Sequence, residues 1–210
     1  MSSASDVAFT PSVKSVQERR GSRKGYAQME AKGGWETTVS PDLAAFIAEV
    51  RSFYLATASK DGQPYIQHRG GPKGFLHVLD AKTLAFADFS GNRQYITTGN
   101  LAENPHAFIF LMDYASRRRV KLWGEARVVE DDPELVRRLT IEGYLGRPEQ
   151  VIVFTLKAWD ANCPQHIPQM FFVEDIKEAV DGLKNRIAQL EQQNAKLRAA
   201  QGAKEQRGGT

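Results

Sequence analysis

The sequence has few of the features that mark secreted or membrane proteins. It contains one cysteine, Cys163, among 210 residues, so no disulfide can form within the chain. A reducing compartment is therefore expected. No apolar run is long enough to span a membrane, and residues 1–20 lack the apolar core of a secretory signal. These absences predict a cytoplasmic protein with no membrane partner.

Motifs that hold dinucleotides, triphosphates or metals are also missing. There is no G-x-G-x-x-G fingerprint and no Walker loop, which disfavours dinucleotide-binding and P-loop folds. The four histidines and the single cysteine are scattered without ligand spacing, so no metal site is predicted. No Ser/His/Asp order and no pair of carboxylates stands out.

Charge is nearly balanced, with a formal net charge of +3, and does not by itself indicate a nucleic-acid-binding protein. The basic residues cluster in an N-terminal arm, residues 1–39, where Thr10-Pro11 and Ser22 are each expected to start a helix. The arm is either a solvated helical surface, or a segment that packs on a partner subunit, or a nucleic-acid contact. Because no aromatic residues interleave with the basic ones, we predict no nucleic-acid partner.

Residues 40–172 alternate between apolar runs and short turns, and 41% of the chain is hydrophobic. Ser40-Pro41 and Asp132-Pro133 start helices, and residues 92–101 form a third. The short turns between strands favour a mainly β fold, an antiparallel barrel with peripheral helices, over a doubly wound sheet. The predicted strands are 53–59, 64–69, 75–79, 84–89, 106–113, 119–129 and 151–159.

From residue 173 the pattern changes to alternating spacings of four and three. The seam consists of Ile176, Val180, Leu183, Ile187, Leu190, Asn194 and Leu197. It predicts an amphipathic or coiled-coil helix over residues 173–200, which either packs on its own barrel or pairs with its mate in a dimer. Residues 201–210 are polar and Gly-rich and are predicted to form a disordered tail.

The segment 65–104 carries residues of the types that hold a phosphate near strand ends and turns. They are Arg69, Lys73, Ser90, Asn92 and Arg93. A phosphate monoester carries close to two negative charges near pH 7, and arginine forks and hydroxyl or amide donors match it. This segment is the predicted phosphate end of a cofactor site.

Three stretches also carry a resemblance: FADFSGNRQYITTGNLAENP, RRRVKLWGEARVV and WDANCPQHIPQ. The first is similar to the strand, phosphate loop and helix of the pyridoxamine 5'-phosphate oxidase family of flavin proteins. The other two resemble that family's later strand and the C-terminal segment of an oxidase-related subfamily. The resemblance covers residues 40–172, and the Asn-Cys-Pro-Gln-His-Ile string is its most specific part.

This resemblance implies an FMN-binding split barrel that forms a homodimer with FMN at the subunit interface. Carried over by position, it places Arg69 at the start of the second flavin-contacting strand. Ser90 and Arg93 then fall in the phosphate-binding loop, with Lys73 and Asn92 as auxiliaries. The resemblance further implies that Arg119 lies near the flavin ring, with Gln165 and His166 on the ring or substrate side.

The implied function is an oxidoreductase that transfers a hydride through flavin N5 on a small substrate, with His166 as the candidate catalytic proton donor. Two alternatives stay open: a non-catalytic flavin carrier, and a barrel that uses a deazaflavin or haem, the haem having His166 as axial ligand. The phosphate loop reads Ser-Gly-Asn-Arg with no lysine following. This departure disfavours pyridoxamine phosphate as the substrate.

Overall fold

The protein is described by a computed structural model that covers residues 3–162 and 164–207. The chain divides into two compact units, Met1–Ile167 and Pro168–Thr210. The first holds the sheet and most of the helices, and the second consists mainly of one long helix. Cys163 and residues 208–210 of the predicted tail lie outside the described residues.

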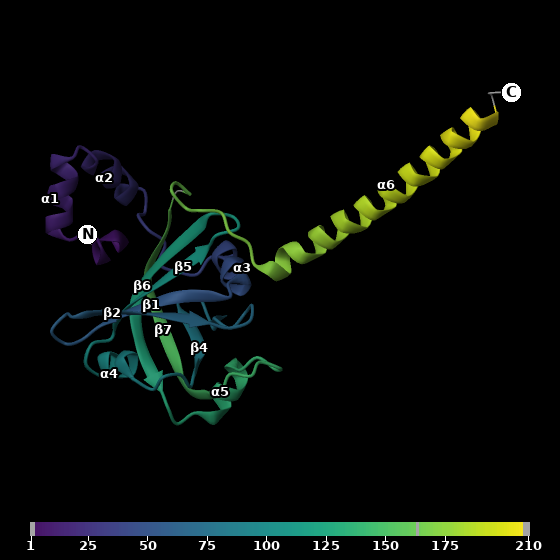
Figure 1. Cartoon of the computed structure of the whole chain (residues 1–210). Helices are drawn as coiled ribbons and strands as arrows, with labels where there is room; N and C mark the ends of the chain where they lie inside the picture. Colours follow the sequence, from purple (N-terminus) through teal and green to yellow (C-terminus); the bar gives the residue numbers. More distant parts are fainter. Residues whose placement is uncertain (1–2, 163, 208–210) are drawn as a thin grey trace. The chain divides into compact units, whose positions relative to one another are not determined.

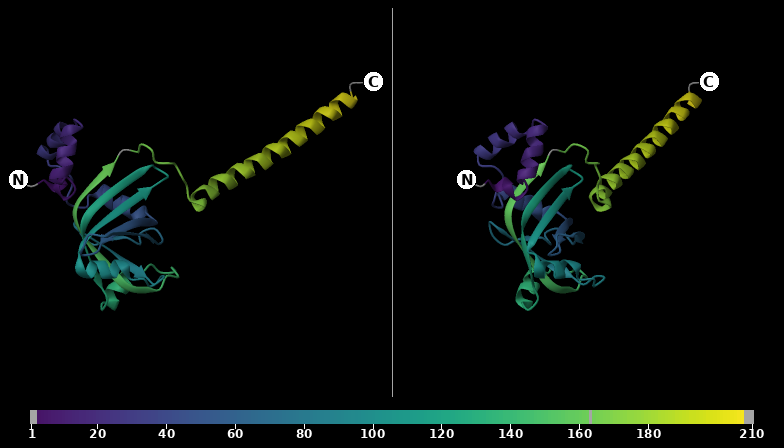
Figure 2. Two further views of the ribbon diagram at one scale, coloured as in Figure 1. Left: turned by 60° about the vertical axis from the view of Figure 1, so that its left-hand side comes forward. Right: turned by 90° about the vertical axis from the view of Figure 1, so that its left-hand side faces the viewer.

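The first unit is built on a seven-stranded sheet in which every neighbouring pair is antiparallel (Figure 1). The spatial order is β2-β1-β5-β6-β7-β4-β3, and Figure 2 shows how strongly the sheet curves. The strands are β1 (Ser52–Ala58), β2 (Pro64–Gly70), β3 (His77–Val78), β4 (Thr83–Phe89), β5 (His106–Asp113), β6 (Arg118–Val129) and β7 (Pro148–Asn162). This confirms the predicted antiparallel split barrel with peripheral helices.

Alternation along the strands decides which face becomes the core. Leu55, Ile109 and Leu122 stand directly opposite one another on β1, β5 and β6 and are fully buried. Successive side chains of a strand point to opposite faces, so the intervening residues lie on the outer face. Burial of each large aliphatic side chain stabilises the fold by about 1.5–3 kcal/mol, and this inward row therefore specifies the register of the three strands.

Helix α3 (Pro41–Glu49) begins as its sequence predicts. The Ser40 hydroxyl accepts the Leu43 N–H at 3.2 Å, and Pro41 occupies the first turn. Its buried face, Leu43, Phe46 and Ile47, joins the main core. Two further helices follow strands: α4 (Ile96–Glu103) after β4 and α5 (Pro133–Leu139) after β6.

The predicted third strand, 75–79, is mostly absent. Only His77–Val78 pairs with β4. Gly74 has a φ of +81° and the Phe75 N–H donates to the Pro72 carbonyl at 3.1 Å, so a turn occupies the start of the predicted strand. Phe75 is nevertheless buried and stacks on Phe53, because the apolar run packs into the core from a turn.

The N-terminal arm folds as η1 (Ala4–Val7), α1 (Pro11–Arg19) and α2 (Arg23–Ala31). Glu30 ties these segments together: its carboxylate pairs with Arg23 and accepts a hydrogen bond from the Ser5 hydroxyl at 3.1 Å. Next along the chain, the Trp35 ring stacks on Trp123 of β6 at 4.5 Å between centroids. The arm is thus attached to the outer face of the sheet.

Acid is expected to loosen this arm. The Arg23 guanidinium, helped by the Ser5 hydroxyl, holds the pKa of Glu30 below its ordinary value of 4.5. A depressed folded-state pKa gives stability that is complete above about pH 4.5 and is lost as the pH falls through the folded value. Tryptophan fluorescence, which reports on Trp35, should therefore change below pH 4.5, and Glu30→Gln should remove that part of the change. A Glu30→Gln protein with the wild-type acid profile would contradict the assignment.

The second unit contains α6 (Val173–Arg207). The helix continues beyond residue 200, where the sequence predicts its end. Its apolar seam is not covered by any other described helix or strand of the second unit; Leu183 and Leu197, for example, have 65% and 64% of their surface accessible.

Candidate functional site

A small pocket of about 50 Å³ lies where β2, the end of β4 and the start of α4 meet. Three of the predicted phosphate residues, Arg69, Asn92 and Arg93, line it. The other lining residues are Tyr65, Gln67, Asp88, Phe89, Gly91, Gln94, Tyr95, Ile96, Thr97, Thr98 and Glu149. The structure therefore brings together residues from 65 to 149 at one end of a helix.

Strand β2 presents Arg69 to this pocket because of its register. Arg69 stands directly opposite Phe53, which is buried in the core, and directly opposite residues share a face of the sheet. Gln67 lies on the same face, while Ile66 is 60% exposed on the other. The edge strand therefore turns its polar side chains inward.

These inward side chains bridge the gap between β2 and the segments across from it. Arg69 forms an ion pair with Asp88 of β4, and the Thr97 hydroxyl of α4 donates to the Gln67 side-chain oxygen at 3.0 Å. No backbone ladder joins β2 to β4 among the described residues. Side-chain bonds thus hold the two sides of the split together at the pocket.

Asp88 is a buried carboxylate with two kinds of partner. Besides Arg69, it accepts a hydrogen bond at Oδ2 from Gln150 Nε2 at 2.8 Å. The same Gln150 nitrogen donates to the Thr98 hydroxyl at 2.9 Å. A buried charge is tolerated when it is paired and hydrogen-bonded, so this network compensates for the desolvation of Asp88 and fixes the position of Arg69.

One N–H donor of Arg69 is unpaired in the described part of the chain. Its Nε is buried and has no hydrogen-bond partner among the residues that the structure describes. Buried polar groups normally have a partner, and guanidinium has five N–H donors. An unpaired donor at the pocket fits an anionic ligand.

The loop before α4 is conformationally unusual. Arg93 and Tyr95 have φ values of 59° and 53°, a region that non-glycine residues rarely adopt. Such conformations concentrate at functional sites. Arg93 Nε donates to the Tyr95 hydroxyl at 3.0 Å, and this bond raises the pKa of Arg93. The guanidinium is therefore charged at every physiological pH.

Helix α4 begins without a side-chain cap. Tyr95, at its N-cap position, makes no side-chain capping bond, and the residues of the first turn, Ile96 to Thr98, line the pocket. The first N–H groups of a helix have no partner inside it, and the helix dipole adds partial positive charge there. Helix N-termini bind phosphate for this reason.

The other predicted phosphate residues have different surroundings. Asn92 lines the pocket, and its side-chain oxygen accepts the Gln94 N–H at 3.3 Å. Ser90 is exposed and is not a lining residue. Lys73 is also absent from the lining and pairs with Glu49 at 2.7 Å on the surface. The structure thus separates Lys73 and Ser90 from the other three.

Arg119 lies on the opposite face of the sheet from Arg69. Val120, its neighbour, faces the core, so Arg119 points outward by alternation. Its Nε is buried without a hydrogen-bond partner among the described residues. Gln165 and His166, near the end of the same unit, are exposed, and His166 has a φ of 63°.

The two predicted ends of the cofactor site lie on different faces of the sheet. Arg69 stands in register with Val120 across β2, β1, β5 and β6. Arg119 is the chain neighbour of Val120 and therefore points to the other face. None of Arg119, Gln165 and His166 lines the pocket that holds Arg69. One chain does not bring the two groups together there.

The family model described as pyridoxamine 5'-phosphate oxidase matches residues 39–163, more than half of the chain. The chain belongs to the pyridoxamine 5'-phosphate oxidase family. Its architecture is accordingly a flavin-binding, oxidoreductase-type fold. No curated protein matches the sequence.

Solved structures are similar to this family member at low sequence identity. HupZ of Group A Streptococcus has a TM-score of 0.50 at 17% identity, over 63% of this chain and 99% of that one. An FMN-binding protein from Syntrophomonas wolfei has 0.43 at 16%, over 70% and 97%. An F420 reductase has 0.42 at 20%, over 55% and 94%. The likeness to HupZ shows the fold alone.

Sequence reasoning missed several residues that line the pocket of this pyridoxamine 5'-phosphate oxidase family member. Tyr65 and Gln67 share a face with Arg69 at intervals of two, and that period could have identified them. Asp88 is a carboxylate within an otherwise apolar strand, which is a second usable signal. No sequence pattern identifies Thr98 or Glu149. Glu149 reaches the site only through the pairing of β4 with β7, which are distant in the sequence.

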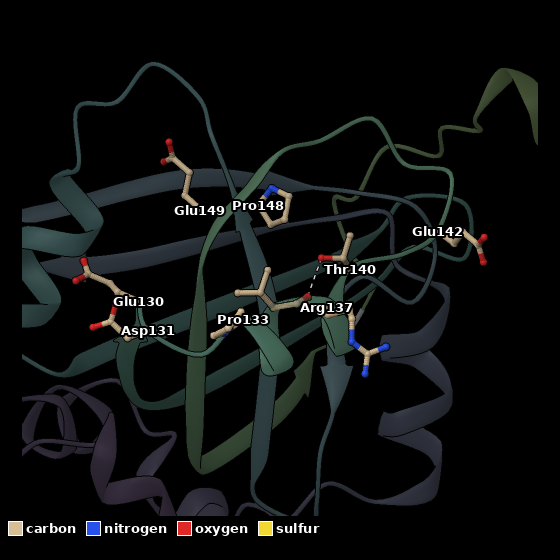
Figure 3. A pocket seen from close by; sticks show the side chains of 9 residues that line it. Glu130, Asp131, Pro133, Arg137, Thr140, Glu142, Pro148 and Glu149 are labelled. Carbon is tan, nitrogen blue, oxygen red and sulfur yellow. Dashed lines mark hydrogen bonds between the residues drawn. The ribbon is translucent and has the colours of Figure 1, made fainter.

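A larger hollow of about 900 Å³ beside α5 is unsuited to an anionic cofactor (Figure 3). Glu130, Asp131, Glu142 and Glu149 line it, and they would repel a phosphate. In the described part of the chain, no three His, Cys, Asp or Glu side chains are arranged to hold a metal ion. Among the same residues, no helix combines the length and apolar character that a membrane crossing requires.

Proposed function

We propose that the protein is an FMN-dependent oxidoreductase that acts on a small organic substrate, and that it binds the FMN phosphate at the start of α4. One observation carries the proposal: Arg69 and Arg93 meet an uncapped helix N-terminus in one pocket. Together they offer two charged forks and the free N–H groups of the first turn. The family membership supports flavin as the ligand class, and the FMN-binding protein with a similar chain course is in line with it.

The phosphate contacts divide between fixed and mobile groups. Arg69 is held in place by Asp88 and offers its free Nε. Arg93 is exposed on a loop and can close over the phosphate with both nitrogens of its fork. Asn92 supplies an amide donor, since its oxygen is already used by Gln94. Asp88 and Glu149 oppose a second anion, so affinity depends on the arginines and on the helix terminus.

The ring end requires a second copy of the chain. Arg119 has a buried, unpaired Nε, yet it points to the outer face of the sheet and does not line the phosphate pocket. A homodimer with FMN between subunits would join the pocket of one copy to Arg119, Gln165 and His166 of the other. Bound FMN would supply hydride transfer at its N5 atom. Arg119 would stabilise negative charge near the ring, and His166 would hold the proton exchanged with the substrate.

The proposal is tested with the purified protein and added FMN, followed by visible absorption and flavin fluorescence. Wild-type protein is expected to bind FMN. Arg93→Ala should weaken binding by roughly 10- to 100-fold, the range for one hydrogen bond to a charged group. Lys73→Ala is the matched control and should bind like the wild type, because Lys73 pairs with Glu49 outside the pocket.

Several outcomes of this titration would contradict the proposal. Protein that is colourless and takes up no FMN would remove its basis, and preferential uptake of F420 would reassign the cofactor. Equal loss in Arg93→Ala and Lys73→Ala would displace the phosphate from the start of α4. Bound FMN that is never reduced by NADH, NADPH or a panel of small metabolites would indicate a flavin carrier in place of an enzyme. The single cysteine supports the cytoplasm as its place of action.

A further inference from the structure

Within the second unit, helix α6 presents an apolar seam that no other described helix or strand of that unit covers. With Asn194, its members recur at alternating intervals of four and three, and the apolar ones are each at least 40% exposed: Ile176, Val180, Leu183, Ile187, Leu190 and Leu197. We propose that α6 pairs with α6 of a second copy as a parallel, in-register, two-stranded coiled coil. This interface is separate from the FMN site and does not depend on it.

The residue types along the seam favour two strands in parallel. In the heptad labelled a to g, the a positions hold the β-branched Val173, Val180 and Ile187. The d positions from the second heptad on hold leucine: Leu183, Leu190 and Leu197. β-branched residues at a with leucine at d favour parallel dimers, whereas isoleucine at both positions or leucine at a favours higher oligomers.

Asn194 specifies both direction and register. It occupies the a position of the last complete repeat of the seam. In a parallel, in-register pair, Asn194 meets the partner's Asn194, and the two amides can hydrogen-bond across the seam. An antiparallel pair would place the amide against the apolar d residues of the partner, and a pair shifted by one heptad would place one of the two amides against Ile187 of the partner subunit. A single buried Asn of this kind costs stability and selects one arrangement.

The flanking charges agree with the same arrangement. Arg186 occupies a g position and Glu191 the following e position. In parallel coiled coils a g residue faces the next e residue of the other helix. Arg186 therefore meets the partner's Glu191, and symmetry forms this pair twice. Within its own helix, Arg186 donates to Gln189 at 3.4 Å, a long bond that leaves the guanidinium available.

Pairing also explains how α6 exists as a helix. Most helical stability in proteins comes from packing of an apolar face, and the second unit contains no other described helix or strand against which this face could pack. Two copies bury both seams at once. Because parallel helices begin at the same end, the two barrel units are tethered at that end through residues 168–172. The coiled coil thus raises the local concentration of one barrel near the other.

Disulfide trapping in the full-length protein tests direction and register together. Cys163→Ser first removes the natural thiol. In that background, Leu190→Cys places two thiols face to face across a parallel seam, while Gln192→Cys places them on the outer face. Oxidation should give a covalent dimer on a denaturing gel roughly tenfold or more faster for Leu190→Cys, because paired positions have a high effective concentration. Equal rates for the two variants would overturn the proposal.

A charge exchange gives a second, independent readout. Glu191→Lys puts like charges at both symmetry-related pairs and should lower the midpoint of α6 unfolding, followed by circular dichroism. Arg186→Glu combined with Glu191→Lys restores opposite charges and should recover it. Failure of the double variant to recover the midpoint would exclude the parallel pairing. A dimer held only by its barrels would show neither the trapping nor the charge rescue, so it also counts against the proposal.

Discussion

Arg69→Gln is expected to lower FMN affinity by roughly 100-fold, the largest binding effect of any single substitution in the pocket. The change removes the positive charge of this pocket-lining residue and its unpaired Nε donor, and each hydrogen bond to a charged group is worth about 1.5–3 kcal/mol. It also leaves the buried Asp88 carboxylate without its cation, bonded to Gln150. The free energy of unfolding should therefore fall by roughly 3 kcal/mol. Flavin fluorescence titration and denaturant unfolding measure the two effects.

Asp88→Asn separates binding from folding at this pair. It removes the negative charge that opposes a phosphate, so folded protein should bind FMN roughly tenfold more tightly, although the buried Arg69 charge loses its counter-ion. Combining Arg69→Gln with Asp88→Asn leaves two neutral amides, which should recover most of the stability but not the wild-type affinity. If Arg69→Gln binds FMN like the wild type once folded, Arg69 has no role in phosphate binding.

Gly124→Ala is expected to lower the free energy of unfolding by about 3 kcal/mol or more, the largest effect on folding of any substitution considered. A Cβ at Gly124 would lie 2.3 Å from the Thr155 carbonyl oxygen and 2.5 Å from the Phe154 ring. The oxygen belongs to the backbone of β7, where β6 and β7 shift register beside Trp123 and Gly124. Overpacking a core costs about 1–3 kcal/mol, and a backbone obstacle leaves less room to relax. Urea unfolding gives the value directly.

Gly99→Ala is the matched control in the same unit. Gly99 lies inside α4, and a Cβ there meets nothing within 4 Å. Alanine in a helix interior is favoured over glycine by about 1 kcal/mol, so the free energy of unfolding should rise. Two results would contradict this explanation: a Gly124→Ala protein as stable as the wild type, or a Gly99→Ala protein as unstable as Gly124→Ala. Either would show that position 124 does not require glycine to prevent a steric clash with β7.

Much of the barrel was predictable because its information is local. Ser40-Pro41 predicts the start of α3, since capping needs only neighbouring residues. The alternation in residues 53–59 predicts β1 and its buried side. The prediction of a strand over residues 75–79 was mostly wrong, because apolar character indicates burial and does not distinguish a strand from a buried turn.

The candidate site was predictable only in part, for a different reason. Arg69, Asn92 and Arg93 were identified as phosphate residues, and they share the pocket. Lys73 has the same chemistry and lies only four positions from Arg69, yet its ammonium group pairs with Glu49 on the surface. Charge and sequence distance do not say which way a side chain points, and the turn at Gly74 redirected this segment.

By itself, the amino-acid sequence determined the class of fold, the family resemblance and the heptad seam of α6. These depend on periodicity and on short motifs, which are properties of neighbouring residues. Only the tertiary structure decided that Arg69 is held by Asp88, that the pocket includes Glu149, and that Arg119 faces the other side of the sheet. Those facts depend on strand order and register between distant segments. These contacts form only when the strands pair to make the barrel, and no short sequence pattern specifies that pairing.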